Sequence, residues 1–297
     1  MSNKALKVEE QIALLRGRGM VIEDEKKAKE ELLDIGYYRL GYCWFPFEET
    51  YPCLENRTHK FRVGTNFNDA VKLYYFDFDL RNLLIKYISR IEIKFKTTLT
   101  YIVSNEYPNS PTWFVDPSVV EQSFIKSFDE TIYTTKLRRK SPIARHHKKY
   151  PNDKYAPVWK VIEYMTLGAT ITLYRALRSP EMQKQVANEM GLKYSKVFKN
   201  YIDLVKDLRN CCAHGNVIFD FRPSDSIRSG PAISHFPDGW QNLYGALRVI
   251  LYLLGSVSKK RQGDLRKEVL DLMNKYGTTT EVRRVLDEES GLKHWKA

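Results

Sequence analysis

The sequence has few cysteines and no pattern of metal ligands, and both absences narrow its possible chemistry. Only four cysteines occur in 297 residues, and Cys211 and Cys212 are adjacent, which makes a disulfide between them difficult. We therefore expect reduced thiols. No Cys-x-x-Cys pair is present, and the six histidines are scattered or, at His146 and His147, adjacent without ligand spacing. The sequence thus predicts no bound metal and no other cofactor.

Long apolar runs are also missing. No run approaches the roughly 20 residues that a helix needs to cross a bilayer. The opening residues, MSNKALKVEEQ, lack the apolar core of a signal peptide. We therefore expect a cytoplasmic protein without membrane contact.

Acidic residues are outnumbered, and this imbalance is informative. With 48 Lys and Arg against 36 Asp and Glu, the formal net charge is +12. Excess cations attract polyanions through phosphate neutralisation and counterion release, so nucleic acid is the leading partner. The alternative is a basic surface that serves solubility. A hydrophobic fraction of 43% is typical of a globular protein with a substantial core, in one elaborate domain or two smaller ones.

Hydrophobic periodicity predicts helices throughout, and no run alternates as a strand would. A less regular region is expected between residues 108 and 155, and a long loop between 216 and 238. The expected helices cover residues 5–18, 24–36, 67–106, 157–177, 195–214, 240–256, 259–276 and 279–288. The segment 67–106 is expected to be one long helix or two collinear ones. The fold class is therefore all-α, opening with a helical hairpin.

Seven aromatic residues crowd around Arg39 in the segment GYYRLGYCWFPFEETY. One interpretation is a platform on which unpaired RNA bases stack with help from the arginine. The other is an aromatic plug that seals the hairpin onto the rest of the fold, and we favour it because aromatics mostly supply core area.

Polar residues also lie near one stripe of the expected helix 67–106. Arg81 and Glu92 are candidates for groups presented in a cleft. The alternative is that they belong to surface ion pairs at i,i+4 spacing, Asp77 with Arg81 and Glu92 with Lys96.

The basic excess becomes local in the run KLRRKSPIARHHKK, which contains no acidic residue. Ser141 and Pro142 interrupt it, so we expect an exposed and mobile arm that contacts RNA phosphates. A solvated loop without a partner is the alternative. The candidate RNA-binding residues are Lys136, Arg138, Arg139, Lys140, Arg145, His146, His147, Lys148 and Lys149, together with Arg39.

The segment Arg209-Asn210-Cys-Cys-Ala-His214 is the candidate catalytic motif, at the end of a helix that Gly215 stops. RNA can be cleaved without metal when a base deprotonates the ribose 2′-OH and an acid protonates the departing 5′ oxygen, and histidine can serve either step. Arginine offers a planar fork to the phosphate, and Asn210 can orient either partner. Arg139 and His146 have a similar spacing, but Pro142 lies between them and no helical framework is expected to hold them. We therefore do not take this pair as catalytic.

Two structural considerations bear on this motif. Arg209 and His214 are offset by about 140° around a helix, so one copy makes an awkward site. A two-fold dimer would bring two arginines and two histidines around one phosphate. The structural alternative is that His214 caps the helix end while Arg209 pairs with Asp207 or a more distant carboxylate.

RNCCAH resembles the Arg-x4-6-His signature of the HEPN superfamily of helical ribonucleases. The whole sequence is similar to the Abi family of abortive-infection proteins, of the AbiD and AbiF type. Four blocks carry this likeness over about residues 8–220, namely IGYYRLGYCWFPF, FDFDLRNLLIKYISRIEIKFKTTL, PVWKVIEYMTLG and LRNCCAHG.

The resemblance implies a HEPN-like helical bundle over residues 61–297, with a basic insertion at about 108–155 and additional C-terminal helices. Residues 1–60 would form a helical and aromatic region packed on this core. The implied activity is a metal-independent endoribonuclease that halts growth during phage infection, is regulated by a small non-coding RNA and dimerises through the motif helices. Arg209 and His214 would be catalytic, with Asn210 supporting them. A HEPN protein that binds RNA or a protein partner without cleaving is the alternative.

Overall fold

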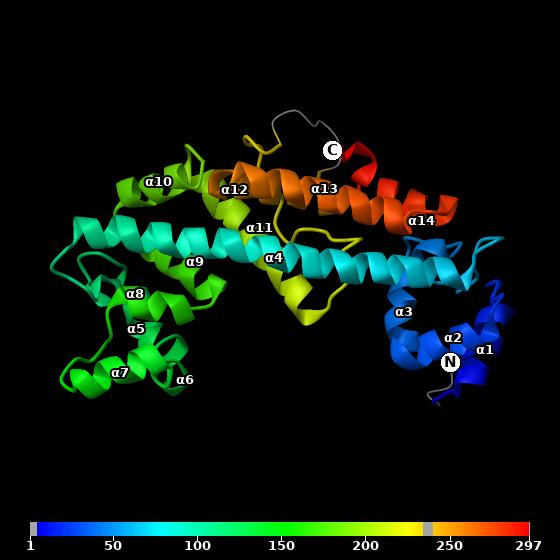
Figure 1. Cartoon of the computed structure of the whole chain (residues 1–297), viewed down its shortest axis with the longest axis horizontal. Coiled ribbons are helices and arrows are strands. Elements are labelled where there is room, and N and C mark those ends of the chain that lie inside the picture. The colour runs from blue at the N-terminus through cyan, green and yellow to red at the C-terminus, as the bar shows by residue number, and fades with distance from the viewer. Residues whose placement is uncertain (1–4, 234–239, 297) are drawn as a thin grey trace.

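The computed structural model describes residues 5–233 and 240–296, and this part of the protein is helical (Figure 1). Within it, β structure is limited to isolated bridges such as that between Val21 and Asn66. The all-α prediction is confirmed. The longer helices are α1 (Val8–Gly17), α2 (Glu25–Asp34), α3 (Tyr37–Trp44), α4 (Phe67–Glu106), α5 (Gln122–Thr131), α7 (Ser141–Lys149), α9 (Leu167–Ala176), α10 (Pro180–Glu189), α11 (Ser195–His214), α12 (Leu243–Val257) and α13 (Lys259–Tyr276).

Helix α4 is the spine of the molecule and has the bounds that periodicity predicts. Asn66 caps its start by accepting a hydrogen bond from the backbone N–H of Asn68 at 2.9 Å. Helices α12 and α13 pack along one side of α4, and α3 and α11 contact it elsewhere along its length (Figure 1). None of the described helices combines the length and apolarity needed to cross a membrane.

The N-terminal helices form a lobe at one end of α4, which we call the aromatic lobe (residues 5–63). Asp24 caps α2 by accepting from the backbone N–H of Lys27 at 2.9 Å, and the predicted hairpin of α1 and α2 is confirmed. On and just after α3, Trp44 and Phe47 are buried, as expected of a plug. Tyr38 and Tyr42 are 80% and 50% exposed. The plug interpretation thus describes only part of the aromatic cluster.

A second lobe, which we call the basic lobe (residues 122–164), lies near the other end of α4 and corrects the prediction of a mobile arm (Figure 1). The basic run folds into two helices, α6 (Thr135–Arg138) and α7, and Pro142 occupies the first turn of α7. Proline is compatible with a first turn because its missing N–H would have no helical partner there. The charges are therefore carried on a folded scaffold.

The basic lobe is held together by a small polar and apolar core. Ile143 is fully buried, and the buried His146 contacts Asp153 with 3.0 Å between Nε2 and Oδ2. Nε2 of His147 lies 2.8 Å from the hydroxyl of buried Tyr133, which also accepts the backbone N–H of Ala156 at 2.7 Å. His146 was expected on a phosphate-binding surface, but its ring is inside the lobe.

The single helix predicted over residues 157–177 is also wrong, because the helix is interrupted in its middle. Helix α8 (Val158–Val161) continues as a 3-10 turn (Ile162–Tyr164), and α9 starts only at Leu167. The carbonyl of Met165 accepts a hydrogen bond from the buried Lys96 ammonium of α4 at 2.7 Å. Thr166 then caps α9 by accepting from the backbone N–H of Ala169 at 3.1 Å.

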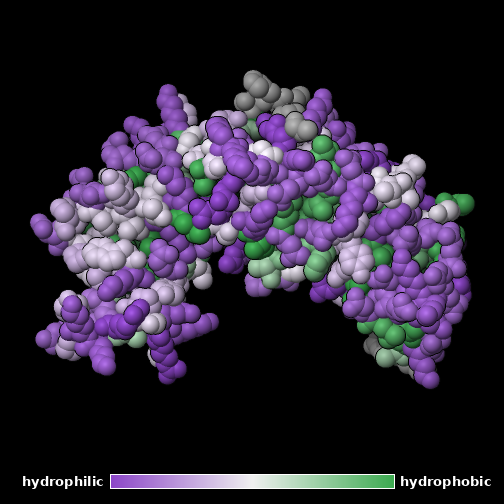
Figure 2. Space-filling model, in the orientation of Figure 1, coloured by the Kyte–Doolittle hydropathy of each residue, from purple (hydrophilic) through white to green (hydrophobic). Residues whose placement is uncertain are grey.

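The residues that follow α13 form short helical segments, α14 (Thr280–Arg284), a π turn (Val285–Glu289) and a 3-10 turn (Leu292–His294). Together the elements make an arch, with α4, α12 and α13 as the span and the two lobes as its feet (Figure 1). Figure 2 shows a broad hollow between the feet. Helix α11 crosses the span and its C-terminal end projects on the side of the hollow (Figure 1). The candidate motif therefore lies between the two lobes.

Candidate active site

Helix α11 ends at the motif as the sequence predicts. Its apolar stripe is buried and includes Phe198, Ile202, Val205, Leu208 and Cys212. Gly215 then adopts a left-handed conformation with φ of 71°, which glycine adopts without steric cost. The backbone N–H of Asn216 returns to the carbonyl of Cys211 at 3.0 Å.

Two arginines from other helices bind the end of α11. Nη1 of Arg81, on α4, donates to the carbonyl oxygens of Gly215 at 3.1 Å and Asn216 at 3.0 Å. Nη1 of Arg39, on α3, donates to the same Gly215 oxygen at 3.1 Å. The negative end of a helix dipole favours cations, so both guanidinium groups satisfy and stabilise this terminus. Of the two predicted cleft residues, Arg81 reaches the motif.

Asp77 connects this clamp to the segment that follows. It pairs with Arg81 at 2.8 Å and accepts the backbone N–H groups of Ile218 and Phe219 at 2.7 and 2.8 Å. Burial raises the pKa of Asp77 to about 6, while Arg81 and the two N–H groups oppose that rise. The predicted pair therefore exists, but it is buried rather than on the surface, with side chains 2% and 7% exposed.

The other predicted ion pair of α4, Glu92 with Lys96, is also largely buried. Lys96 lies 2.9 Å from Glu92, and their side chains are 8% and 16% exposed. Lys96 also holds the Met165 carbonyl at the break before α9. Glu92 therefore supports the packing of α9 and not the end of α11.

The motif side chains themselves are available. His214 is exposed, and among the described residues its imidazole has no hydrogen-bond partner. Arg209 is partly buried, and its Nη1 lies 3.4 Å from Oδ1 of Asn210. Within the described part of the protein, Arg209 meets no carboxylate at ion-pair distance. Arg39 and Arg81 cap the end of this helix. The alternative that His214 serves as the cap is therefore wrong.

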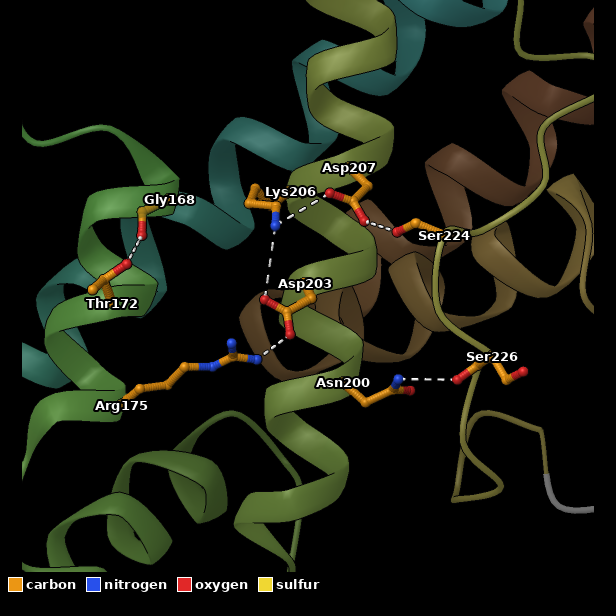
Figure 3. A network of polar contacts seen from close by, with 9 residues as sticks. All are labelled: Gly168, Thr172, Arg175, Asn200, Asp203, Lys206, Asp207, Ser224 and Ser226. Carbon is orange, nitrogen blue, oxygen red and sulfur yellow. Dashed lines mark hydrogen bonds and ion pairs between the residues drawn. The ribbon is translucent and has the colours of Figure 1, made fainter.

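Asp207, which the structural alternative pairs with Arg209, bonds to other residues (Figure 3). It accepts the Ser224 hydroxyl at 2.7 Å and pairs with Lys206 at 3.2 Å. One turn earlier, Asp203 pairs with Arg175 of α9. Among the residues that the structure describes, no carboxylate therefore neutralises Arg209.

The loop after the motif runs back along α11. Besides the Ser224 contact, the carbonyl of Ser226 accepts from Asn200 at 3.0 Å (Figure 3). The backbone N–H of Arg228 donates to the same Asn200 side chain at 2.8 Å. This agrees with the loop predicted from residue 216 as far as residue 233, and residues 234–239 lie outside the described residues. The sequence did not predict these contacts, because they join residues 26 and 28 positions apart that the fold brings together.

The basic residues gather at a distance from α11, on the basic lobe. Seven of the nine candidates there are exposed, namely Lys136, Arg138, Arg139, Lys140, Arg145, Lys148 and Lys149. Sequence reasoning missed two aromatic residues beside them, Trp159 and Tyr164, which are 51% and 38% exposed. Nζ of Lys140 lies 5.6 Å from the Tyr164 ring centre.

Arg39 was predicted to help stack RNA bases, but its guanidinium lies on the Gly215 carbonyl. Its neighbours Tyr38 and Tyr42 carry the exposed rings instead. No group of three or more His, Cys, Asp or Glu side chains in the described residues is arranged to hold a metal ion.

The fold and site define an all-helical, basic protein with a partly buried Arg209 and an exposed His214 at a clamped helix end. Residues 30–220 match the family described as Abi-like protein, so the chain belongs to that family. Family membership supports a role in abortive infection. No curated protein and no solved structure gives a significant match.

Proposed function

We propose that this protein is a metal-independent endoribonuclease of abortive infection, with Arg209 and His214 as catalytic residues. The observation that carries the proposal is the state of these two side chains. Arg209 has no carboxylate partner among the described residues, and His214 is exposed at a helix end that other residues cap. Side chains that support a fold are normally engaged in it, whereas these two are free to meet a ligand.

The chemistry needs a proton acceptor for the ribose 2′-OH, a proton donor for the departing 5′ oxygen and positive charge near the phosphate. His214 supplies a proton-transfer group. Arg209 supplies a planar cation for the charge that builds on the phosphate oxygens, and Asn210, which contacts Arg209, orients it. The bond that breaks joins phosphorus to the 5′ oxygen, and the 2′ oxygen forms the new bond, which leaves a cyclic phosphate.

One copy supplies one histidine, and the reaction uses both an acid and a base. A two-fold dimer that apposes the ends of two α11 helices provides two histidines and two arginines, so we propose a homodimer through these helices. Mixing Arg209→Ala with His214→Ala protein tests this arrangement. Partial recovery of cleavage supports a shared site, and no recovery contradicts it.

RNA is also the proposed partner of the basic lobe. Its exposed cations, with Trp159 and Tyr164 beside them, combine phosphate binding with stacking. A regulatory RNA and the substrate strand are both compatible with this chemistry. We also propose that the protein acts in the cytoplasm.

The test of the proposed activity incubates purified protein in EDTA with an end-labelled single-stranded RNA. Wild type should cleave it, and His214→Ala should lose about 10²-fold or more of the rate, as removal of a general acid or base does. His294→Ala is the matched control, because His294 is also exposed but belongs to the 3-10 turn Leu292–His294 and not to α11. Equal cleavage by wild type and His214→Ala overturns the assignment.

The second candidate is an RNA-binding protein that does not cleave. It is favoured by the separation of Arg209 and His214 around α11, since no hydrogen bond joins them in the described structure. RNA that is bound tightly by wild type but remains intact in the cleavage assay supports this candidate.

A further inference from the structure

The aromatic lobe contains an open cavity of about 620 Å³. This volume lies within the roughly 300–1,000 Å³ typical of small-molecule sites. Tyr37, Tyr38, Tyr42 and Phe45 line it, so flat rings surround much of the space. The lobe also shows apolar surface near the hollow (Figure 2).

Two of these lining rings, those of Tyr38 and Tyr42, are 80% and 50% exposed. Tyr38 and Tyr42 stand one turn apart on α3, with ring centres 5.5 Å apart and planes at 86°. The Tyr42 hydroxyl donates to that of Tyr38 at 3.2 Å, which fixes the pair. A fixed and exposed aromatic pair provides a face on which another flat ring can stack.

Charged groups at the cavity favour an anion. Arg57 holds buried Glu48 in a bidentate pair at 2.6 and 3.0 Å and lies 4.1 Å above the Phe45 ring centre. Arg18 also lines the cavity and donates to the Tyr37 hydroxyl at 3.0 Å. Two guanidinium groups against one carboxylate leave a net positive cavity, which suits a base that carries a phosphate.

The cavity and the motif share helix α3. Tyr38 and Tyr42 line the cavity, while Arg39 between them donates to the Gly215 carbonyl at the end of α11. Residues 39 and 42 are separated by about 60° around a helix, so these are adjacent faces. A nucleotide in the cavity would therefore lie against the same helix that contacts the end of α11.

We propose that this cavity binds one unpaired base of the RNA that reaches His214, with Tyr38 and Tyr42 as the stacking residues. This inference rests on the proposed function for its ligand, but it concerns binding and not cleavage. The site selects for single-stranded or locally opened RNA, because a paired base cannot enter a pocket of rings.

The experiment uses His214→Ala protein, in which the RNA stays intact, and a short single-stranded RNA with 2-aminopurine placed at each position in turn. Stacking quenches the fluorescence of 2-aminopurine, so one position should show quenching on binding. Adding Tyr38→Ala or Tyr42→Ala should remove that quenching and weaken binding about tenfold, the scale of a single base–aromatic stack.

Tyr101→Ala is the matched control, because Tyr101 is 70% exposed but lies on α4 outside the cavity. Tyr38→Phe keeps the ring and should retain affinity, and unchanged thermal unfolding shows that the variants fold. Equal affinity of Tyr38→Ala and Tyr101→Ala protein, or quenching at no position, overturns the proposal. If wild type never cleaves RNA but one 2-aminopurine position is still quenched on binding, the enzymatic function is overturned and the base site stands.

Discussion

The two lobes of the arch differ in what they offer to a ligand. The aromatic lobe presents exposed rings around a cavity and touches the motif through Arg39. The basic lobe presents a continuous set of cations on α6 and α7, fixed on a buried core of Tyr133, Ile143 and His146. Single-strand-binding proteins often combine stacking and charge in one groove. Here exposed rings predominate in the aromatic lobe and cations predominate in the basic lobe, where Trp159 and Tyr164 add two further exposed rings.

This division corrects how each region is understood. An acid-free basic run is normally a solvated segment, yet Pro142 lies in the first turn of α7, and His146 and His147 make contacts within the lobe. A dense aromatic cluster normally belongs to the core, yet Tyr38 and Tyr42 remain outside it. Residue type predicted the chemistry of each lobe, whereas its rigidity and exposure depended on tertiary contacts.

The largest expected effect tests whether the basic lobe is a folded unit. Ile143→Ala removes a fully buried side chain and should destabilise this lobe by about 2–5 kcal/mol. Leu54→Ala in the aromatic lobe is the control, since Leu54 is 74% exposed and should change stability by less than about 0.5 kcal/mol. Hydrogen exchange of the α7 amides measures the difference, and equal protection in both variants would mean that the basic run is a mobile arm.

The second prediction separates charge from stacking. Replacing Arg145, Lys148 and Lys149 with glutamine should weaken RNA binding about tenfold or more at low salt. It should also reduce the slope of log affinity against log salt by about 0.7 for each phosphate that is no longer neutralised. Tyr38→Ala should weaken binding with little change of slope. Fluorescence anisotropy across a salt series measures both, and the same slope change in the two variants would remove the distinction between the lobes.

A smaller effect concerns the link between the aromatic lobe and the motif. Arg39→Ala removes one of two guanidinium donors on the Gly215 carbonyl, and Arg81 keeps the other. Because Arg39 is exposed, the expected loss of stability is at most about 1 kcal/mol. The cleavage rate should fall by more than this loss of stability explains, because the motif loses a contact that positions it. Cleavage equal to that of wild type would show that this link does not position the motif.

The smallest effect is pH dependence confined to the basic lobe. Burial lowers the pKa of His147 from its ordinary 6.5, and the charges of His146 and Arg138 lower it further. The unfolded state therefore takes up the proton first as pH falls below about 6.5, and the lobe loses stability in that direction. Hydrogen exchange at pH about 7.5 and about 5.5 should show α7 opening in acid in wild type and less so in His147→Gln. An equal pH response in both proteins would contradict this cause.

Periodicity predicted the long elements well because their apolar stripes face one continuous core. The bounds of α4 agree with the prediction, and Gly215 ends α11 as its type suggests. The break before α9 was not predictable from local pattern. It depends on the Lys96 ammonium reaching the Met165 carbonyl across 69 positions of sequence.

The two ion pairs of α4 show the same limit at the site. Asp77 with Arg81 and Glu92 with Lys96 have identical spacing and the same order of charge, so the sequence does not distinguish them. Only their tertiary partners do, because Arg81 meets the end of α11 whereas Lys96 meets the start of α9. The sequence thus predicted the motif and offered Arg81 and Glu92 as its neighbours. It did not indicate that only Arg81 contacts the end of α11.

In the proposed mechanism, the groups at the end of α11 cleave RNA by using its own 2′-OH. The most direct measurement compares, in EDTA, an RNA that is cleaved at one position with the same RNA carrying a single 2′-deoxyribose on the 5′ side of that bond. Wild type should leave a cyclic phosphate on the first RNA and should not cut the second. His214→Ala should cut the first RNA far more slowly than wild type does and should not cut the second. Cleavage of the deoxy-substituted bond by wild type, or undiminished cleavage by His214→Ala, would contradict this mechanism.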